Sequence, residues 1–145
     1  MQIASITIRG ANLGDHAAIA PLLLQLGYAM SAQSIRERLA IVVASPGDHS
    51  LVACLNEELV GLITLHVIPL LHATCPMGRI TSLIIDERHR GKGIGSALMT
   101  AAERWFTKVG CTKVEVTSAD HRTHAHRFYE GCGLSRHGQR FVKTL

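Results

Sequence analysis

The chain has 145 residues, 47% hydrophobic and 18% charged, a balance typical of one globular domain rather than a disordered or repetitive chain. No run of about eighteen apolar residues predicts a membrane span, and the N-terminus lacks the basic and apolar regions of a signal peptide, so we expect a cytoplasmic protein without membrane contact. The net charge of +4 is scattered and aromatic residues make up only 4%, which argues against nucleic-acid binding. The four cysteines are widely spaced and indicate reduced thiols without a structural metal.

Alternating apolar residues, helical spacing and turn residues predict ten elements. In chain order they are a strand (3–9), a helix capped by Asp15 and ended by Gly27, a helix (31–42) capped by Ser31, strands (50–55, 59–68 and 79–86), a helix (93–109), a strand (113–117), a helix (121–132) and a strand (139–144). The strands at 50–55 and 59–68 form a hairpin, and Pro21 is expected to kink the first helix.

The stretch 83–99 holds the clearest functional signal. An apolar, β-branched strand is followed by a basic turn, by glycines at 91, 93 and 95, and by a helix. Glycines allow close approach of a ligand to the backbone, and the free N–H groups of a helix N-terminus attract phosphate. A tight turn without a ligand is the alternative, but three glycines are costly in a plain turn. The spacing fits neither the Walker A loop nor the dinucleotide-binding fingerprint.

Arg90, Gly93 and Gly95, preceded by the apolar run 83–85, resemble the signature loop of the GNAT superfamily of N-acetyltransferases, which binds the pyrophosphate of acetyl-CoA. The resemblance implies a single α+β domain over residues 1–145, with a mixed, mostly antiparallel sheet of six to seven strands between about four helices. It also implies that the strands at 79–86 and 113–117 splay apart around the pantetheine arm, and that a homodimer is possible. The cofactor-binding residues that it implies here are Leu83, Ile84, Ile85, Arg90, Gly91, Lys92, Gly93, Ile94, Gly95 and Ser96.

A second stretch, 121–134, is similar to a later motif of the same family. The matching residues are Ala125, Phe128, Tyr129, Gly133 and Leu134. Arg122 occupies the position of the usual asparagine, and with Ala125 and Phe128 it is implied to contact the cofactor. Tyr129 is implied to be the general acid that protonates the departing thiolate; taken alone, it also fits a core residue with a surface hydroxyl. His121 and His124 share a helix face while His126 points elsewhere, and no nearby cysteine or carboxylate completes a tetrahedral set, so we expect no metal site.

The implied reaction is direct transfer of an acetyl group from acetyl-CoA to a primary amine of a small molecule or peptide. A free alkylamine is protonated at neutral pH, so the reaction needs a base. Glu115 is our candidate, with His66 and His72 as further candidates, and each also fits a solvated residue. The missing obvious base keeps an alternative open, a non-catalytic acyl-CoA-binding sensor or interaction module with the same fold.

Overall fold

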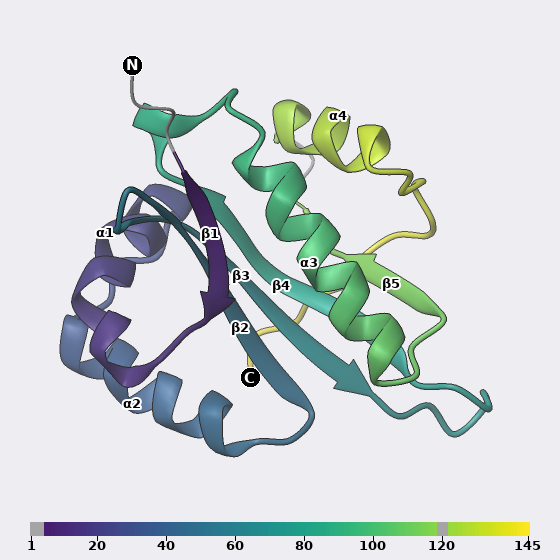
Figure 1. The fold of residues 1–145 in the computed structure, drawn as a ribbon. Coiled ribbons are helices and arrows are strands. Elements are labelled where there is room, and N and C mark those ends of the chain that lie inside the picture. Colours follow the sequence, from purple (N-terminus) through teal and green to yellow (C-terminus); the bar gives the residue numbers. More distant parts are fainter. Residues whose placement is uncertain (1–4, 119–121) are drawn as a thin grey trace.

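Five strands form one mixed sheet in the order β1-β2-β3-β4-β5 in the computed structural model, which describes residues 5–118 and 122–145 (Figure 1). The elements are β1 (Ile6–Gly10), the 3-10 turn η1 (Leu13–Asp15), α1 (His16–Leu26), α2 (Ala32–Ala44), β2 (Asp48–Leu55), β3 (Glu58–Ile68), β4 (Met77–Ile85), the 3-10 turn η2 (Glu87–His89), α3 (Ile94–Lys108), β5 (Lys113–Val116) and α4 (Thr123–Gly131). The first four strands pair antiparallel, and β5 pairs parallel to β4. None of the helices in the described ranges is long and apolar enough to span a membrane.

Helices cover both faces of the sheet (Figure 1). Alternate residues of β2 belong to two separate clusters: Leu51 packs with Phe106 of α3, whereas Val52 packs with α1 and α2. This alternation follows from the period of two along a strand. Burying a side chain such as that of Phe106, which is 1% exposed, contributes about 1.5–3 kcal/mol. The expected α+β class, with four α-helices around a mixed sheet, is confirmed.

The hairpin of β2 and β3 contains an irregularity that matters for the site. Its two-residue turn holds Asn56 and Glu57 at positive φ, as tight hairpins require. A register shift then lies between Ala53 and Cys54, so that Val60 is left without an opposite residue. Such a bulge changes which side chains face each other along the rest of the hairpin.

β4 has an open edge beside β5. The parallel pairing joins only Met77–Ile80 to Lys113–Val116, while β4 continues to Ile85. In the described part of the chain, residues 81–85 therefore have a strand neighbour on the β3 side alone. The edge is open because β5 is paired along its whole length and ends at Val116; the splaying expected between the two strands stays a prediction.

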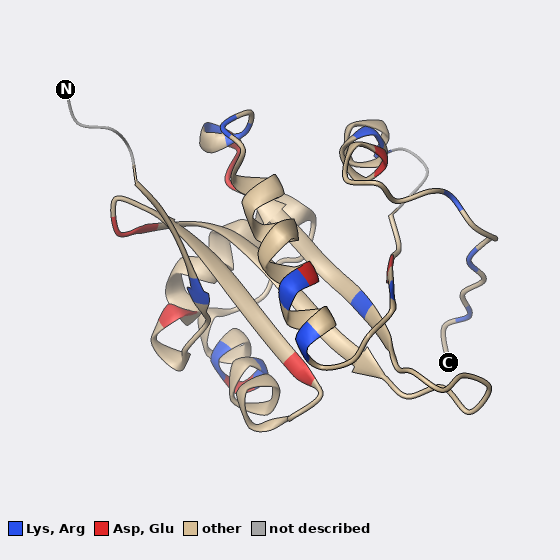
Figure 2. Cartoon of the chain, turned by 45° about the vertical axis from the view of Figure 1, so that its right-hand side comes forward, with Lys and Arg blue, Asp and Glu red and all other residues tan. Residues whose placement is uncertain are grey.

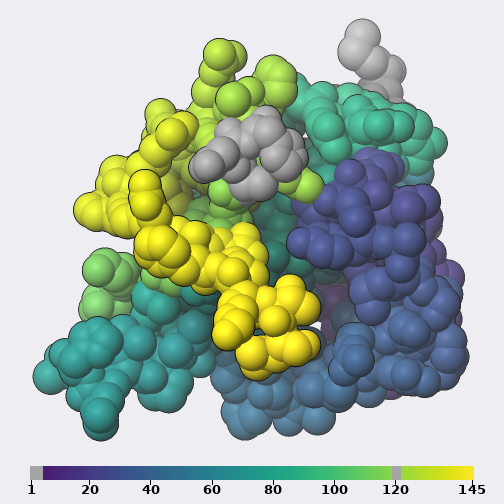
Figure 3. All heavy atoms as spheres, turned by 180° about the vertical axis from the view of Figure 1, so that it is seen from behind, coloured from purple at the N-terminus to yellow at the C-terminus, as the bar shows by residue number. Residues whose placement is uncertain are grey.

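The prediction of a strand at 139–144 is wrong. Residues 134–145 contain no helix or strand, and the sheet has five strands rather than six to seven. The segment crosses the side of the sheet opposite α3 and leaves Phe141 90% exposed (Figure 3). Apolar and β-branched residues favour a strand only where a neighbouring strand offers backbone partners and a surface for packing.

Two predicted helix caps have different outcomes. Ser31 caps α2 as expected, because its hydroxyl accepts a hydrogen bond from the Ser34 N–H at 3.1 Å. Asp15 stands at the N-cap position of α1, but its side chain makes no capping bond to that helix. Its carboxylate instead binds both terminal nitrogens of Arg9 at 2.8 Å, and this ion pair and hydrogen bond lower the pKa of Asp15. Pro21 lies inside α1, which continues to Leu26.

Candidate active site

The corner between β4 and α3 has an open backbone. Gly91 and Gly93 adopt positive φ values of 77° and 81°, a left-handed conformation that favours glycine. A Cβ built on either residue would have no atom within 4 Å. The first N–H groups of α3 have no partner within the helix, and they lie next to this open space. The corner therefore has the space and the donors that a pyrophosphate needs, together with the positive end of a helix dipole.

Asp86, which follows β4 directly, holds the corner in place. Its carboxylate accepts hydrogen bonds from the backbone N–H of Arg88 at 3.1 Å and from the guanidinium of Arg88 at 2.9 Å. These bonds lower the pKa of Asp86 to about 2. Gln25 of α1 reaches the same turn, where its side-chain oxygen accepts the N–H of Glu87 at 3.0 Å. The corner is thus anchored to the helix layer on the other face of the sheet.

The basic residues of the corner are placed differently from one another. Arg90 donates from Nε to the backbone oxygen of Ile85 at 3.1 Å, which leaves the terminal nitrogens of its guanidinium for other acceptors. Lys92 lies 3.2 Å from Nδ1 of His89. Both side chains are exposed, so both can turn toward an anionic ligand.

Predicted cofactor residues in β4 and α3 differ in what they can offer. The side chain of Ile84 is buried against α1 and α2, and that of Ile94 is buried beneath α3, so each can contact a ligand only through its backbone. The N–H of Asp86 donates to the Val60 oxygen on β3. Because successive residues of a strand direct their backbone groups to opposite sides, the N–H of Ile85 points to the open edge.

Helix α4 closes the corner from the other side. The ring of Phe128 lies over Gly95, where a Cβ would be 3.2 Å from it. The neighbouring Tyr129 is partly buried against the α3 core. Burial raises the pKa of Tyr129, and the positive charge of Arg122 opposes this rise. The hydroxyl therefore keeps its proton at neutral pH, as a general acid must.

Arg122 has a partner that the sequence did not suggest. Its Nη2 donates to the backbone oxygen of Leu26 at 2.6 Å, at the end of α1. The side chain thereby joins the start of α4 to the α1–α2 connection. Ala125 is on the same helix as Tyr129, and His121 lies outside the described residues. The cofactor contacts assigned to Arg122, Ala125 and Phe128 stay predictions.

The candidate base Glu115 lies in an ion pair. Its carboxylate accepts from Arg79 at 2.6 Å, and the two side chains are 45% and 35% exposed. His72 is exposed in the connection between β3 and β4. His66, in contrast, is held by two hydrogen bonds of 2.7 Å, one to Asp48 and one to Thr81. The sequence analysis missed both of these partners, which lie 18 and 15 residues from His66.

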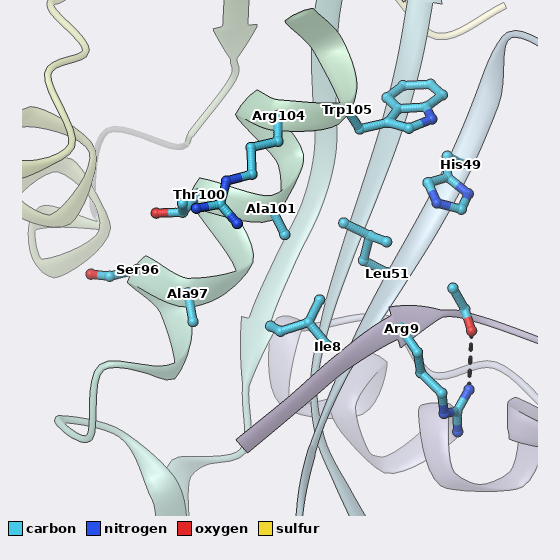
Figure 4. A pocket seen from close by; sticks show the side chains of 11 residues that line it. Ile8, Arg9, His49, Leu51, Ser96, Ala97, Thr100, Ala101, Arg104 and Trp105 are labelled. Atoms are coloured by element: carbon cyan, nitrogen blue, oxygen red, sulfur yellow. Dashed lines mark hydrogen bonds between the residues drawn. The ribbon is translucent and has the colours of Figure 1, made fainter. Parts of the chain in front are cut away.

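Two further features are a cleft and a group of possible metal ligands. A cleft of about 720 Å³ opens between α3 and strands β1 and β2, next to Trp105 and His49 (Figure 4). Of the predicted cofactor residues, only Ser96 is at its rim.

Among residues 5–118 and 122–145, one group could gather its donors at a metal ion: Glu58, Asp86 and His89. Arg88 donates to both carboxylates of this group at 2.9 Å, so it is an ion-pair network.

Comparison with known proteins decides the family. A model described as the acetyltransferase (GNAT) family matches residues 23–134, which include the glycine corner and α4. The chain belongs to this family. This GNAT protein is 32% identical over 139 residues to an aminoalkylphosphonate N-acetyltransferase of Salmonella typhimurium, covering 95% of this chain and 90% of that protein. It is 28% identical over 135 residues to an aminoglycoside N(6')-acetyltransferase type 1 of Stenotrophomonas maltophilia, covering 88% and 85%.

Its fold is also that of a solved aminoglycoside N-acetyltransferase, AAC(6')-Iy in complex with CoA. The TM-score is 0.89 at 14% identity, with 99% of this chain and 97% of the other covered. At that identity the likeness concerns the fold alone. The family resemblance proposed from the sequence is confirmed, and the GNAT protein is an acyltransferase that transfers an acetyl group to an amine.

Proposed function

We propose that this GNAT protein transfers an acetyl group from acetyl-CoA directly to the primary amine of a small molecule or peptide, and that the acceptor is a small amine carrying an anionic group. The observation that carries the first part is the open corner at Gly91 and Gly93, next to free helix N–H groups and to the unpaired edge of β4. A neighbour of the same fold was solved with CoA.

Each part of this site has a role in holding acetyl-CoA, which supplies the acetyl group as a thioester. The N–H groups and cations of residues 90–96 bind the pyrophosphate. The open edge of β4 receives the pantetheine arm, and the N–H of Ile85 donates to a carbonyl oxygen of that arm. Tyr129 holds on its hydroxyl the proton that the departing sulfur needs, and its raised pKa keeps that proton in place.

The charges around the acceptor side support an anionic amine. The C-terminal segment 134–145 carries Arg136, Arg140 and Lys143 and has no acidic residue (Figure 2). On the same face of the sheet, the carboxylates of Asp48 and Glu115 are each already paired with a basic side chain. A polycation would find few free carboxylates here, whereas a phosphonate or carboxylate finds cations. The relative from Salmonella typhimurium is named for aminoalkylphosphonates.

Calorimetric titration with acetyl-CoA, with NAD and ATP as controls, tests the cosubstrate. Saturable one-site binding of acetyl-CoA alone is the expected result, and equal binding of ATP would contradict it. Release of free CoA thiol is then followed with four amines: an aminoalkylphosphonate, an ω-amino acid, an aminoglycoside and a peptide with a free N-terminus. We expect the first two to give the higher kcat/KM, and preference for the aminoglycoside would refute the anionic acceptor.

We further propose that the protein resides in the cytoplasm and pairs as a homodimer through its C-terminal segment. The four cysteines are free thiols, which suits a reducing compartment. Phe141, Val142 and Leu145 are exposed on a segment that pairs with no strand in the described chain, so they are available to a second copy. Light scattering on the full chain and on the Phe141→Ser variant measures the mass; a monomer in both would refute the pairing.

A further inference from the structure

A row of polar side chains crosses four neighbouring strands on the α1–α2 face of the sheet. Asp48, His66, Arg79 and Glu115 are successive register partners on β2, β3, β4 and β5. Gly78 shows which face they share. A Cβ built on Gly78 would meet the Phe106 ring of α3, so the side chain of the next residue, Arg79, lies on the opposite face of the sheet. The row therefore lies on the face that the C-terminal segment crosses (Figure 3).

Within this row, His66 is oriented by two strong hydrogen bonds. Nδ1 lies 2.7 Å from Oδ1 of Asp48, and Nε2 lies 2.7 Å from the hydroxyl of Thr81. A carboxylate only accepts, so Nδ1 carries the hydrogen of the neutral ring. Nε2 then accepts the hydroxyl hydrogen of Thr81. This is the order of groups found in a serine–histidine–aspartate triad, with threonine in place of serine.

Thr81 reaches this position because of a second irregularity in the sheet. Thr64 pairs with Ser82 and Leu65 pairs with Ile80, so Thr81 is the extra residue of β4. It is also the first residue beyond the pairing of β4 with β5, where the open edge begins. Its hydroxyl is exposed and keeps lone pairs that face away from His66. A substrate group at the open edge can therefore contact it.

We propose that Thr81, His66 and Asp48 form a proton relay that deprotonates the acceptor ammonium before acetyl transfer. The proposal rests on the proposed function, because it concerns the base of that same reaction. Thr81 is the group that touches the amine, while His66 and Asp48 act through it. Glu115, the base expected from the sequence, is held by Arg79 in an ion pair that a proton would break.

The proton transfer balances without any other reactant. The substrate ammonium gives one N–H proton to the Thr81 oxygen, while the Thr81 hydroxyl proton moves to Nε2 of His66. The products are a neutral amine, an intact threonine and an imidazolium stabilised by the Asp48 carboxylate. The imidazolium returns its proton to solvent after the reaction. No bond to carbon forms or breaks in this step.

Four variants test the relay on the full chain. Thr81→Val and His66→Gln should each lower kcat with an alkylamine about 100-fold, a usual loss for removal of a general base. Thr81→Ser keeps the hydroxyl and should stay within about fivefold of wild type, since the proton path remains. Thr7→Val makes the same change on the exposed edge strand β1 and should leave activity unchanged. Acetyl-CoA affinity and melting temperature are measured for each, and a Thr81→Val variant that matches Thr7→Val in kcat overturns the relay.

A nucleophile that is already neutral at the assay pH separates deprotonation from a structural role. Hydroxylamine does not need the relay to lose a proton before it attacks. The loss in Thr81→Val should therefore shrink from about 100-fold with the alkylamine to less than about tenfold with hydroxylamine. Equal losses with both nucleophiles would show that Thr81 only shapes the site, and would overturn the proposal.

The pH profile distinguishes His66 from Glu115. The charged side chains facing His66 are Asp48 on β2 and Arg79 on β4, the latter paired with Glu115 on β5; the C-terminal segment on this face has basic side chains and no acidic side chain. An acidic limb of the kcat profile is expected, because the relay needs an unprotonated base to receive the substrate proton. Asp48→Asn should move it to lower pH, because an imidazolium loses its countercharge. A limb that moves with Glu115→Gln instead would overturn the relay.

A measurement without substrate checks the geometry independently of the proposed function. The ¹⁵N signals of the His66 ring in the free protein should show hydrogen on Nδ1, and Thr81→Val should shift the Nε2 signal alone. Hydrogen on Nε2 would overturn the relay even if the enzyme turns over. Absence of turnover with every amine would overturn the proposed function, and the relay with it, whatever the ¹⁵N signals show.

Discussion

Replacement of Gly93 by alanine separates two effects of a methyl group at the corner: backbone strain in the free protein and exclusion of the ligand. At a φ of 81°, an alanine costs about 1–2 kcal/mol. No protein atom lies within 4 Å of the new methyl group, so no further cost arises in the free protein. For a chain of this size we expect the melting temperature to fall by about 3–6 °C.

Gly110 provides a matched control at the other end of α3. Its φ is 94°, and an added Cβ there also has no atom within 4 Å. Gly110→Ala should therefore lose about the same stability as Gly93→Ala while its acetyl-CoA affinity stays at the wild-type value. Gly93→Ala should bind acetyl-CoA at least about tenfold more weakly, or about 1.4 kcal/mol, because in the proposed binding mode the methyl group would stand where the pyrophosphate meets the backbone.

Two measurements on each variant decide the result: a thermal melt and a calorimetric titration with acetyl-CoA. Equal affinities for Gly93→Ala and Gly110→Ala would refute the assignment of the corner. Gly95 is a poorer test than its place in the motif indicates. A Cβ there meets the ring of Phe128 at 3.2 Å, so weaker binding would mix a packing effect with exclusion of the ligand.

Three other substitutions have defined outcomes. Tyr129→Phe should lower kcat without changing acetyl-CoA affinity. A kcat equal to that of wild type in a thiol-release assay would show that Tyr129 is not the acid. In the wild-type protein the raised pKa keeps the hydroxyl protonated, so any loss of activity from its ionisation appears only at strongly alkaline pH. Asp86→Asn should lower the free energy of unfolding at pH 7. The shift from 3.8 to about 2 sets an upper limit of about 2.4 kcal/mol, and the exposure of Arg88 reduces the expected loss to about 1 kcal/mol. A lowered pKa contributes stability that is complete above about pH 4 and is lost as the pH falls toward 2. Urea titrations over that window should therefore show a free energy of unfolding that depends less on pH in the variant than in wild type. The same pH dependence in both proteins would contradict this. Gly78→Ala should cost about 1–3 kcal/mol by overpacking, because a Cβ would lie 2.6 Å from the buried ring of Phe106; an unchanged urea midpoint would contradict it.

The sequence predicts the order of elements well because local signals suffice for it. The glycine corner follows from the change between strand and helix periodicity on either side of Gly91 and Gly93. The prediction of a last strand is wrong for the opposite reason, since residues 139–144 have strand-forming side chains but no partner strand in the described chain. Strand formation is decided by neighbours that the local sequence does not contain.

The contact between Asp48 and His66 could not be predicted from spacing, because it depends on the bulge in the hairpin. Extended from the Leu55–Glu58 pair without that bulge, the register would place Asp48 opposite Leu65 rather than His66. A shift of one residue turns every side chain of a strand to the other face. Only a register that includes the bulge brings the carboxylate to the imidazole.

The order of strands also bears on how the molecule assembles. Strands β1 to β4 each pair with a sequence neighbour among the strands, and β2, β3 and β4 are joined by short connections, whereas β5 reaches β4 only after the whole of α3 has crossed over. Local pairings form early in folding, and a parallel pair needs a long loop to close first. We therefore expect amide hydrogens of β5 to exchange with solvent sooner than those of β2 and β3, and acetyl-CoA to slow that exchange most strongly. In the proposed binding mode, the half of the sheet that receives acetyl-CoA is then also the half that acetyl-CoA stabilises most.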